Sequence, residues 1–418
     1  MYQKTAGFAF TINALIFFFQ ALTKSIYPPL ILPLREALGI DNAAVGFLVT
    51  LVFFGYALAR YPSGVMADKW GCTKTIIIGS LAMAVSFLAV AFSRSFFIIA
   101  LFTFLLGVSS GLYVTAGYTL AVLIGTKHRA SLATAAFESF GMVAGIISPF
   151  LVSFFVLYLN WPCLFIVLGA ALFCITLLFG SRQEMIQRLE QARSIDGLSS
   201  YNACGHSRVG FRELFREMIK PLGMLHDPFI KRFLIWSTLV GGLGAISWTG
   251  VNAFIPTFLV EQKGYSFESA NTMFALIAVS GLTTKIALGL LADRFGSKRI
   301  MIVNLLLSVL FFYALTLAGA HWQLLLILIS LGATSLNANM LINAYVLKSM
   351  PEQNRGAGFG LFCTAYTVIY SFGPYLTGLL SVAVGLSRAI QLSAAGAAAA
   401  LLLVLCSGRL LPLQITAK

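Results

Sequence analysis

Apolar runs of about 20 residues recur along the whole chain, and each is long enough to cross a bilayer core of roughly 30 Å. Hydrophobic residues make up 59% of the 418 residues and charged residues only 10%, against roughly 25% charged residues in an ordinary soluble domain. So few charges cannot cover a water-facing exterior, which predicts an all-α integral membrane protein. Its 12 predicted transmembrane helices are 8–34, 44–67, 74–92, 96–125, 130–158, 161–180, 229–260, 268–292, 299–318, 322–348, 355–384 and 387–411.

The basic residues behind the net charge of +14 are divided among short loops and form no continuous patch, which argues against nucleic-acid binding. They favour one side of the membrane, which predicts a multi-pass protein of the cell (inner, cytoplasmic) membrane with both termini in the cytoplasm. The cysteines show no paired metal-ligand spacing, so we expect neither a metal site nor a disulfide framework. Loops after even-numbered spans carry Lys69, Lys74, Lys127, Arg129, Arg294, Lys298, Arg299, Lys348 and Arg355, and loops after odd-numbered spans carry Arg35, Arg94, Lys263 and Arg388.

The sequence repeats itself at an offset of 225 residues, which carries Glu36 to Glu261, Asp68 to Asp293 and Pro149 to Pro374, among other matches. One ungapped offset over so long a stretch predicts two pseudo-symmetric six-helix halves, as in many transporters. We place the N-terminal half at 1–180, a cytoplasmic linker loop at 181–228 and the C-terminal half at 229–418. Within the linker, "FRELFREMIKPLG" has the pattern of an amphipathic helix on the membrane surface, and a flexible tether is the alternative.

Two segments related by this offset, "GVMADKWGCTK" (64–74) and "GLLADRFGSKR" (289–299), resemble the signature of the major facilitator superfamily in its loops 2/3 and 8/9. The resemblance covers the whole chain and implies the major facilitator fold. Glycines in the signature allow helices and a tight turn to approach closely. The resemblance also implies a conformational latch that forms in one state and breaks in the other, although a plain topogenic turn is a simpler alternative. The latch residues are Gly64, Asp68, Gly71, Lys74, Gly289, Asp293, Arg294, Gly296 and Arg299.

An arginine lies unusually deep in the second span. Arg60 precedes Asp68 by eight residues, or about 12 Å along a helix that rises ~1.5 Å per residue. A charge at that depth costs at least ~2.5 kcal/mol on insertion scales, so it usually faces a cavity or a partner. The repeat places Lys285 at the equivalent position of the second half. This basic pair predicts an anion-binding site.

Two more ionisable residues are predicted inside spans, Lys24 in span one and Glu138 in span five. Glu138 is the single carboxylate that the sequence places deep in a span, so three cations stand against one anion, and the substrate is expected to supply the missing negative charge. Simpler interpretations remain open. Lys24 can extend its stem toward the outer surface. Arg60 can pair permanently with Glu138, and Lys285 can turn toward the cytoplasmic headgroups.

Basic residues at these levels of spans two and eight resemble the nitrate/nitrite porters of the superfamily, in which arginines clamp the anion. "ARYPSG" matches that pattern at Arg60 and Pro62, whereas position 285 is a lysine and spans five and eleven lack the glycine-rich nitrate signature. Span five, with "FESF" at 137–140, is more similar to the organic-anion symporters of the superfamily.

Proton-coupled efflux of multidrug or other amphipathic compounds is the alternative function. Antiporters of that kind usually carry an arginine four residues before a glycine in span four, where this chain has Thr103 before Gly107. Their fifth-span Gly-Pro motif is matched only loosely by Gly141, Gly145 and Pro149. Three buried cations would also repel cationic drugs. A transporter-like receptor that binds its ligand without moving it is a third possibility.

Polar and aromatic residues on the inward faces of several spans suit a substrate with oxygen atoms, such as a carboxylate with hydroxyls. Each of them can instead serve helix–helix packing. They are Tyr113, Tyr118, Trp248, Asn252, Asn337, Asn339, Asn343, Tyr366 and Tyr370, of which Tyr118, Asn252, Asn343 and Tyr366 join the predicted binding site.

The sequence contains no catalytic constellation and no phosphate-cradling Gly-rich loop, so neither enzymatic activity nor ATP or another cofactor is expected. The expected function is secondary active transport of a small anionic solute, an organic carboxylate, by alternating access with proton symport or anion exchange. Arg60 and Lys285 would clamp the anion, while Lys24 tunes the field. Glu138 would couple protons or balance charge. The expected partners are this substrate, protons and the lipid bilayer, and the protein is expected to be a monomer.

Overall fold

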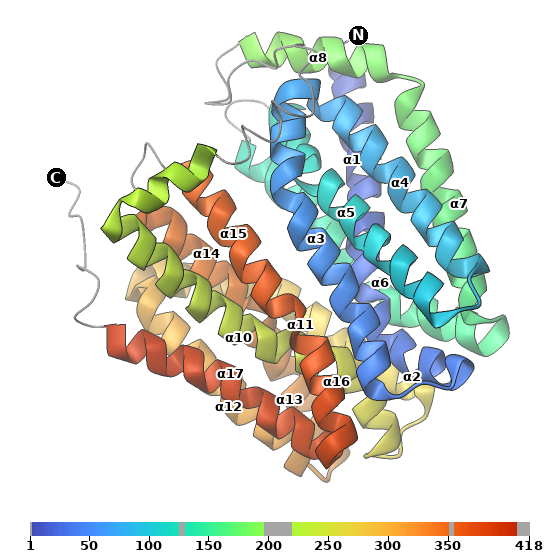
Figure 1. The fold of residues 1–418 in the computed structure, drawn as a ribbon, viewed down its shortest axis with the longest axis vertical. Coiled ribbons are helices and arrows are strands. Elements are labelled where there is room, and N and C mark those ends of the chain that lie inside the picture. Colours follow the sequence, from blue (N-terminus) through green and yellow to red (C-terminus); the bar gives the residue numbers. More distant parts are fainter. Residues whose placement is uncertain (1, 125–129, 196–219, 351–354, 408–418) are drawn as a thin grey trace. The chain divides into compact units, whose positions relative to one another are not determined.

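The computed structural model describes residues 2–124, 130–195, 220–350 and 355–407. These residues form helices connected by short turns, and they contain no strand (Figure 1). Twelve helical segments of the described chain are long and apolar enough to cross a membrane. The prediction of an all-helical protein with 12 transmembrane helices in two related halves is confirmed. Most of the linker stretch predicted as an amphipathic helix lies outside the described residues.

The chain forms two compact units, and the first contains residues 1–26 and 51–220. Within this unit α4 packs against α5 and α7, and α1 packs against α5 and α6. A short helix after the sixth span, α8, contacts α1, α4 and α5, and the sequence analysis did not predict it. The helices of this unit are α1 (Tyr2–Ser25), α3 (Asn42–Trp70) from residue 51 onward, α4 (Cys72–Phe92), α5 (Phe96–Ile124), α6 (Ala130–Tyr158), α7 (Trp161–Gly180) and α8 (Gln183–Ile195).

The second unit contains residues 27–50 and 221–418. Its longest helix, α10, packs against α15, α16 and α17, and α11 packs against α13. The helices are α2 (Tyr27–Leu38), the start of α3, the 3-10 helix η2 (Lys220–His226) from residue 221 onward, α10 (Pro228–Glu261), α11 (Phe267–Phe295), α12 (Ser297–Leu317), α13 (His321–Ala333), the 3-10 helix η3 (Ser335–Asn337), α14 (Ala338–Ser349), α15 (Arg355–Ser371), α16 (Gly373–Val384) and α17 (Leu386–Cys406).

Helix boundaries in the two halves follow the 225-residue offset. The helices α3 and α11 correspond at both ends, as do α4 and α12, and the range of α5 corresponds to that from the start of α13 to the end of α14. Gly39 and Gly264, which the offset also relates, both have a positive φ, 62° and 72°. The repeat read from the sequence is therefore a repeat of local backbone structure.

The halves differ in where their helices break. The predicted first span is two helices, α1 and α2, which meet at Ile26 just before Pro28 and Pro29, because proline favours the first turn of a helix and disrupts its interior. The corresponding part of α10 is continuous. In the second half, span ten is divided by η3 and span eleven is divided at Phe372, whereas their counterparts α5 and α6 are unbroken.

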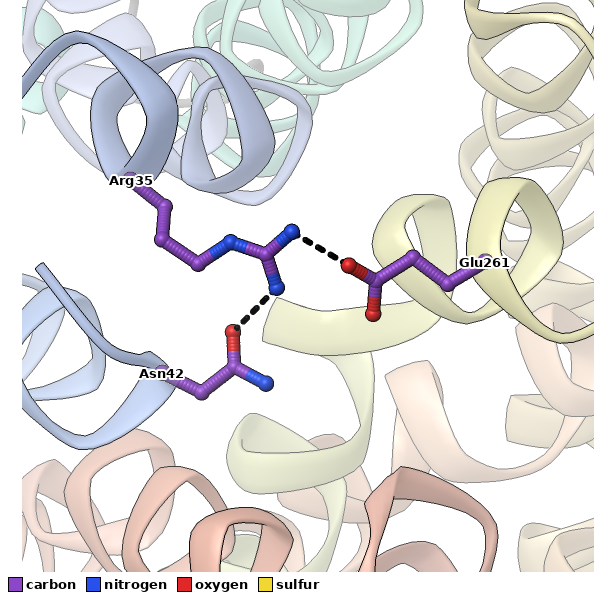
Figure 2. A network of polar contacts seen from close by, with 3 residues as sticks. All are labelled: Arg35, Asn42 and Glu261. Atoms are coloured by element: carbon purple, nitrogen blue, oxygen red, sulfur yellow. Dashed lines mark hydrogen bonds and ion pairs between the residues drawn. The ribbon is translucent and has the colours of Figure 1, made fainter. Parts of the chain in front are cut away.

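Residues 27–50 are anchored within the second unit by a small polar network (Figure 2). Arg35, in the last turn of α2, forms an ion pair with Glu261 at the end of α10 and donates a 3.2 Å hydrogen bond to Asn42 Oδ1. A Cβ on Gly46 would lie 2.5 Å from the backbone oxygen of Pro374, so α3 contacts α16 backbone to backbone there. Glycine makes such close contact between membrane helices possible.

Candidate functional site

The two signature turns share a backbone conformation. Gly71 and Gly296 both have a φ of +91°, which side chains rarely tolerate, and they precede α4 and α12. The signature glycines within α3 and α11 differ from them. A Cβ on Gly64 or Gly289 would approach the neighbouring side chain only to 3.5 Å or 3.9 Å, which is ordinary contact. The expected close helix approach is therefore absent at these two positions, and the turn geometry explains only Gly71 and Gly296.

The charged signature residues lie at the surface of their units. Asp293 accepts a 2.8 Å hydrogen bond from Lys348 on α14, and both side chains are exposed. An exposed pair of this kind contributes only about 0–1 kcal/mol. The Arg294 guanidinium lies 5.5 Å from the Phe295 ring. Asp68, Lys74 and Arg299 are exposed.

The first signature turn also binds a buried carboxylate that the sequence analysis missed. Glu190 of α8 is only 3% exposed. Its Oε1 accepts a 2.6 Å bond from the Cys72 backbone N–H, and its Oε2 accepts bonds from the Thr73 N–H and hydroxyl at 3.3 and 2.9 Å. Glu190 therefore caps the N-terminus of α4, where backbone N–H groups lack helical partners and favour negative charge. Because it lies more than a hundred residues away, no local sequence pattern reveals it.

Two of the predicted cations meet at one tyrosine in the first unit. The Lys24 ammonium lies 4.0 Å from the centroid of the Tyr56 ring, and the Arg60 guanidinium lies 5.9 Å from it. Tyr56 is 6% exposed, whereas both cations are half-buried. Lys24 therefore turns inward over this ring, and the interpretation that it extends to the outer surface does not hold in this conformation.

The predicted carboxylate lies in the same cluster. The Tyr118 hydroxyl of α5 donates a 3.4 Å hydrogen bond to Glu138 Oε1 of α6, and the Tyr118 hydroxyl also lies within electrostatic range of Arg60 and Tyr56. The Tyr118 ring packs edge-on against Phe17 and Phe137, with centroid distances of 5.3 and 5.2 Å. Four helices of one unit, α1, α3, α5 and α6, thus bring two cations, a carboxylate and a phenol together beside apolar rings.

Close packing between α3 and α5 sets the geometry of this cluster. A Cβ on Gly111 of α5 would lie 2.5 Å from the Tyr56 backbone oxygen, so only glycine fits there without displacing the backbone of α3. The Thr115 hydroxyl donates to the Arg60 backbone oxygen at 2.9 Å. Tyr113, predicted to line the cavity, is fully buried and donates to Asn13 Oδ1 at 2.9 Å, so it joins α5 to α1.

The second unit carries a different set of residues at the corresponding positions. The 225-residue offset carries Arg60 to Lys285 and Tyr118 to Asn343, but Lys24 to Thr249, Glu138 to Cys363 and Tyr56 to Gly281. Lys285 on α11 is half-buried. The described residues at these related positions of the second unit therefore do not reproduce the cation–carboxylate–tyrosine cluster of the first.

The remaining predicted site residues lie on three helices of the second unit that pack together, α10, α14 and α15. Asn252 is half-buried, and Tyr366 is buried between Phe362 and Tyr370, with ring centroids 4.8 and 5.5 Å away. The Asn343 Oδ1 atom is buried and has no hydrogen-bond partner among the residues that the structure describes. Asn337 instead donates to the Gly281 backbone oxygen at 3.1 Å, a role in helix packing. No cluster of side chains able to hold a metal ion is found among the described residues.

The chain matches the sequence profile of the Major Facilitator Superfamily over residues 14–289 and 237–414 and belongs to that family of membrane transporters. It is 26% identical to the probable sulfoacetate transporter SauU of Cupriavidus necator, over 90% of this chain and 87% of that protein. It is 24% identical to the gallate transporter of Pseudomonas putida, over 90% of this chain and 86% of that protein. The chain is also 22% identical to a putative multidrug resistance protein, MdtD of Cronobacter sakazakii, over 88% of this chain and 85% of that protein.

A solved bacterial homologue of the lysosomal transporter Spinster has the same fold, with a TM-score of 0.75 over 96% of this chain and 97% of that chain at 13% identity. The resemblance inferred from the two signature copies is confirmed, as is the expectation that the protein is not an enzyme.

Proposed function

We propose that the protein is a secondary transporter of a small organic anion whose head group binds to Lys24 and Arg60 in the first unit. The observation that carries the proposal is the convergence of these cations with Tyr56, Tyr118 and Glu138 inside apolar helices. Related transporters are named for sulfoacetate and gallate, both of which bear a carboxylate. The substrate class predicted from the sequence is therefore retained.

The charges of the cluster favour an anion. Each cation inside a span costs about 2.5–3.5 kcal/mol on insertion scales. In the described part of this cluster, two cations stand beside one carboxylate, so a monoanion neutralises the group. A lipophilic cation would instead add a third positive charge beside Lys24 and Arg60. Lys285 is proposed to supply the cation of the second unit, and Asn252, Asn343 and Tyr366 are proposed to hydrogen-bond polar atoms of the substrate.

Replacement of Arg60 by alanine tests the proposal. We expect the affinity for benzoate or gallate, measured by calorimetry on purified protein, to fall at least about tenfold, because a charge-assisted contact of about 1.5–3 kcal/mol is lost. Lys231→Ala, which removes an exposed lysine of α10 outside the signature and the proposed site, serves as the matched control and should bind as wild type does. The proposal is wrong if wild type binds no small carboxylate or sulfonate. It is also wrong if Arg60→Ala binds these anions as tightly as wild type does.

Glu138 is proposed to couple anion transport to protons. A bound anion repels the negative charge of Glu138 and so favours its protonation, which makes the anion and a proton bind together. If Glu138 instead keeps its charge through the cycle, exchange of one anion for another follows.

In sealed proteoliposomes, anion uptake by wild type is expected to be accompanied by acidification of the lumen, measured with a pH-sensitive dye. Glu138→Gln, which keeps the shape and an acceptor for Tyr118, should abolish proton entry while exchange of internal for external anion persists. Uptake by wild type without acidification would exclude symport and leave exchange.

Proton-coupled efflux of amphipathic compounds is the second candidate, favoured by the similarity to a putative multidrug resistance protein. It predicts that lipophilic cations stabilise wild type and Arg60→Ala alike, the opposite of the anion proposal. We also propose that the protein acts as a monomer in the cell membrane with both termini in the cytoplasm, as its loop charges favour. Accessibility of a C-terminal tag to protease in right-side-out vesicles tests this orientation.

A further inference from the structure

We infer that Tyr56 is a positioning residue of the anion site, because its ring holds the Lys24 and Arg60 cations together before the anion arrives. The inference rests on the proposed function, since it names the residue that prepares the site for its substrate. Tyr56 is absent from the signature segments, and nothing in the sequence pattern distinguishes it from the other tyrosines in the spans.

The geometry places one buried ring between residues of two helices. Lys24 comes from the C-terminal end of α1, while Tyr56 and Arg60 are one helical turn apart on α3. The ammonium lies 4.0 Å and the guanidinium 5.9 Å from the ring centroid, both within the roughly 6 Å over which a ring face attracts a cation. Both charged groups of the proposed site therefore lie within cation–π range of Tyr56.

Two neighbouring cations repel each other, and this repulsion is screened less beside a buried ring in a membrane span than in bulk water. The negative face of an aromatic ring attracts both without neutralising either. A second carboxylate would hold the pair more strongly, but it would compete with the substrate for the same charges. An aromatic ring thus fixes the positions of the cations and leaves their net charge for the anion, and pre-organisation of this kind strengthens binding.

The comparison between the halves supports this role. The residue that the offset relates to Tyr56 is Gly281, and a Cβ there would lie 2.3 Å from the Leu336 side chain. An aromatic residue at that position would therefore displace the Leu336 side chain, and the second unit has threonine where the first unit has Lys24. The Tyr56 ring and Lys24 therefore occur together in the first unit, which is the unit proposed to bind the anion head group.

Affinity for benzoate and for sulfoacetate, measured by calorimetry on the purified full chain, tests the inference. Tyr56→Phe keeps the ring and should bind within about twofold of wild type, whereas Tyr56→Leu should bind about tenfold more weakly. The matched control is Phe87→Leu, which removes a fully buried ring that packs against Phe165 in the same unit. It should leave affinity unchanged.

Fluorinated phenylalanines at position 56 extend the test to a side chain of nearly constant shape. Each added fluorine weakens the negative ring face, so affinity should fall stepwise, and this series remains decisive if Tyr56→Leu does not fold. In a Lys24→Ala background the effect of Tyr56→Leu should be reduced, because the two residues act together.

Each outcome separates the two ideas. If wild type binds no small carboxylate or sulfonate, the proposed function fails. If wild type binds and the fluorinated series is flat, or if Tyr56→Leu binds as wild type does, the role of Tyr56 is wrong while the proposed function stands. If Tyr56→Phe binds as weakly as Tyr56→Leu, the hydroxyl and not the ring is needed, which also overturns the inference.

Discussion

Replacing Gly107 by alanine is expected to leave little folded protein in the membrane. A Cβ at this position of α5 would lie 2.2 Å from the backbone oxygen of Val52 on α3 and 2.9 Å from its carbonyl carbon. Backbone atoms cannot rotate away as a side chain can, so α3 and α5 must separate. Overpacking in a close-packed interior costs about 1–3 kcal/mol, and we expect this contact to reach or exceed the upper end.

The 225-residue repeat provides a second glycine substitution with the same expected effect, and a signature glycine provides a control substitution. Gly332 is related to Gly107 by the offset, and a Cβ there would lie 2.2 Å from the Ile277 backbone oxygen, so Gly332→Ala should behave in the same way. Gly64→Ala adds a Cβ 3.5 Å from its nearest neighbour and should fold normally. The measurement is the yield of monodisperse protein and its apparent melting temperature. Equal yields from Gly107→Ala and Gly64→Ala would contradict the packing described here.

Removal of the Glu190 carboxylate is expected to have the second largest effect on stability. Glu190→Ala leaves the N–H groups of Cys72 and Thr73 without their acceptor in a buried place. An unsatisfied buried donor costs about 1–3 kcal/mol, and the loss of a helix cap lies in the same range. We therefore expect the free energy of unfolding to fall by about 2–4 kcal/mol, with α8 released from α4.

Glu190→Gln separates hydrogen bonding from charge. The amide keeps one acceptor oxygen but loses the negative charge that favours a helix N-terminus, an effect of about 0.3–1 kcal/mol at exposed sites. Its apparent melting temperature should lie between those of wild type and Glu190→Ala. Glu184→Ala, in the first turn of α8 and exposed, is the matched control. A melting temperature for Glu190→Ala equal to that of Glu184→Ala would show that the cap contributes nothing to stability.

The positions at which helices break could be predicted only in part from the local sequence. Pro28 and Pro29 coincide with the start of α2, and Pro374 lies in the first turn of α16, where proline is favoured. Pro149, its repeat-related counterpart, lies within the unbroken helix α6. The same residue at equivalent positions therefore accompanies a break in one half and none in the other, because neighbouring helices decide whether the freed backbone groups find partners.

The spans, their repeat and the depth of the cations follow from the sequence alone. Bilayer thickness fixes the length of an apolar run, and an intramembrane charge is costly enough to be conspicuous. That is why Lys24, Arg60, Glu138 and Lys285 could be singled out.

Only the tertiary structure decided which side chains from different helices meet. The approach of Lys24 to Tyr56 and the bonds of Glu190 to the start of α4 depend on helices that come from different parts of the chain. An apolar span has the same composition whichever face it turns inward. The close backbone contacts of Gly107 and Gly111, which select that face for α3 and α5, exist only once the helices have packed.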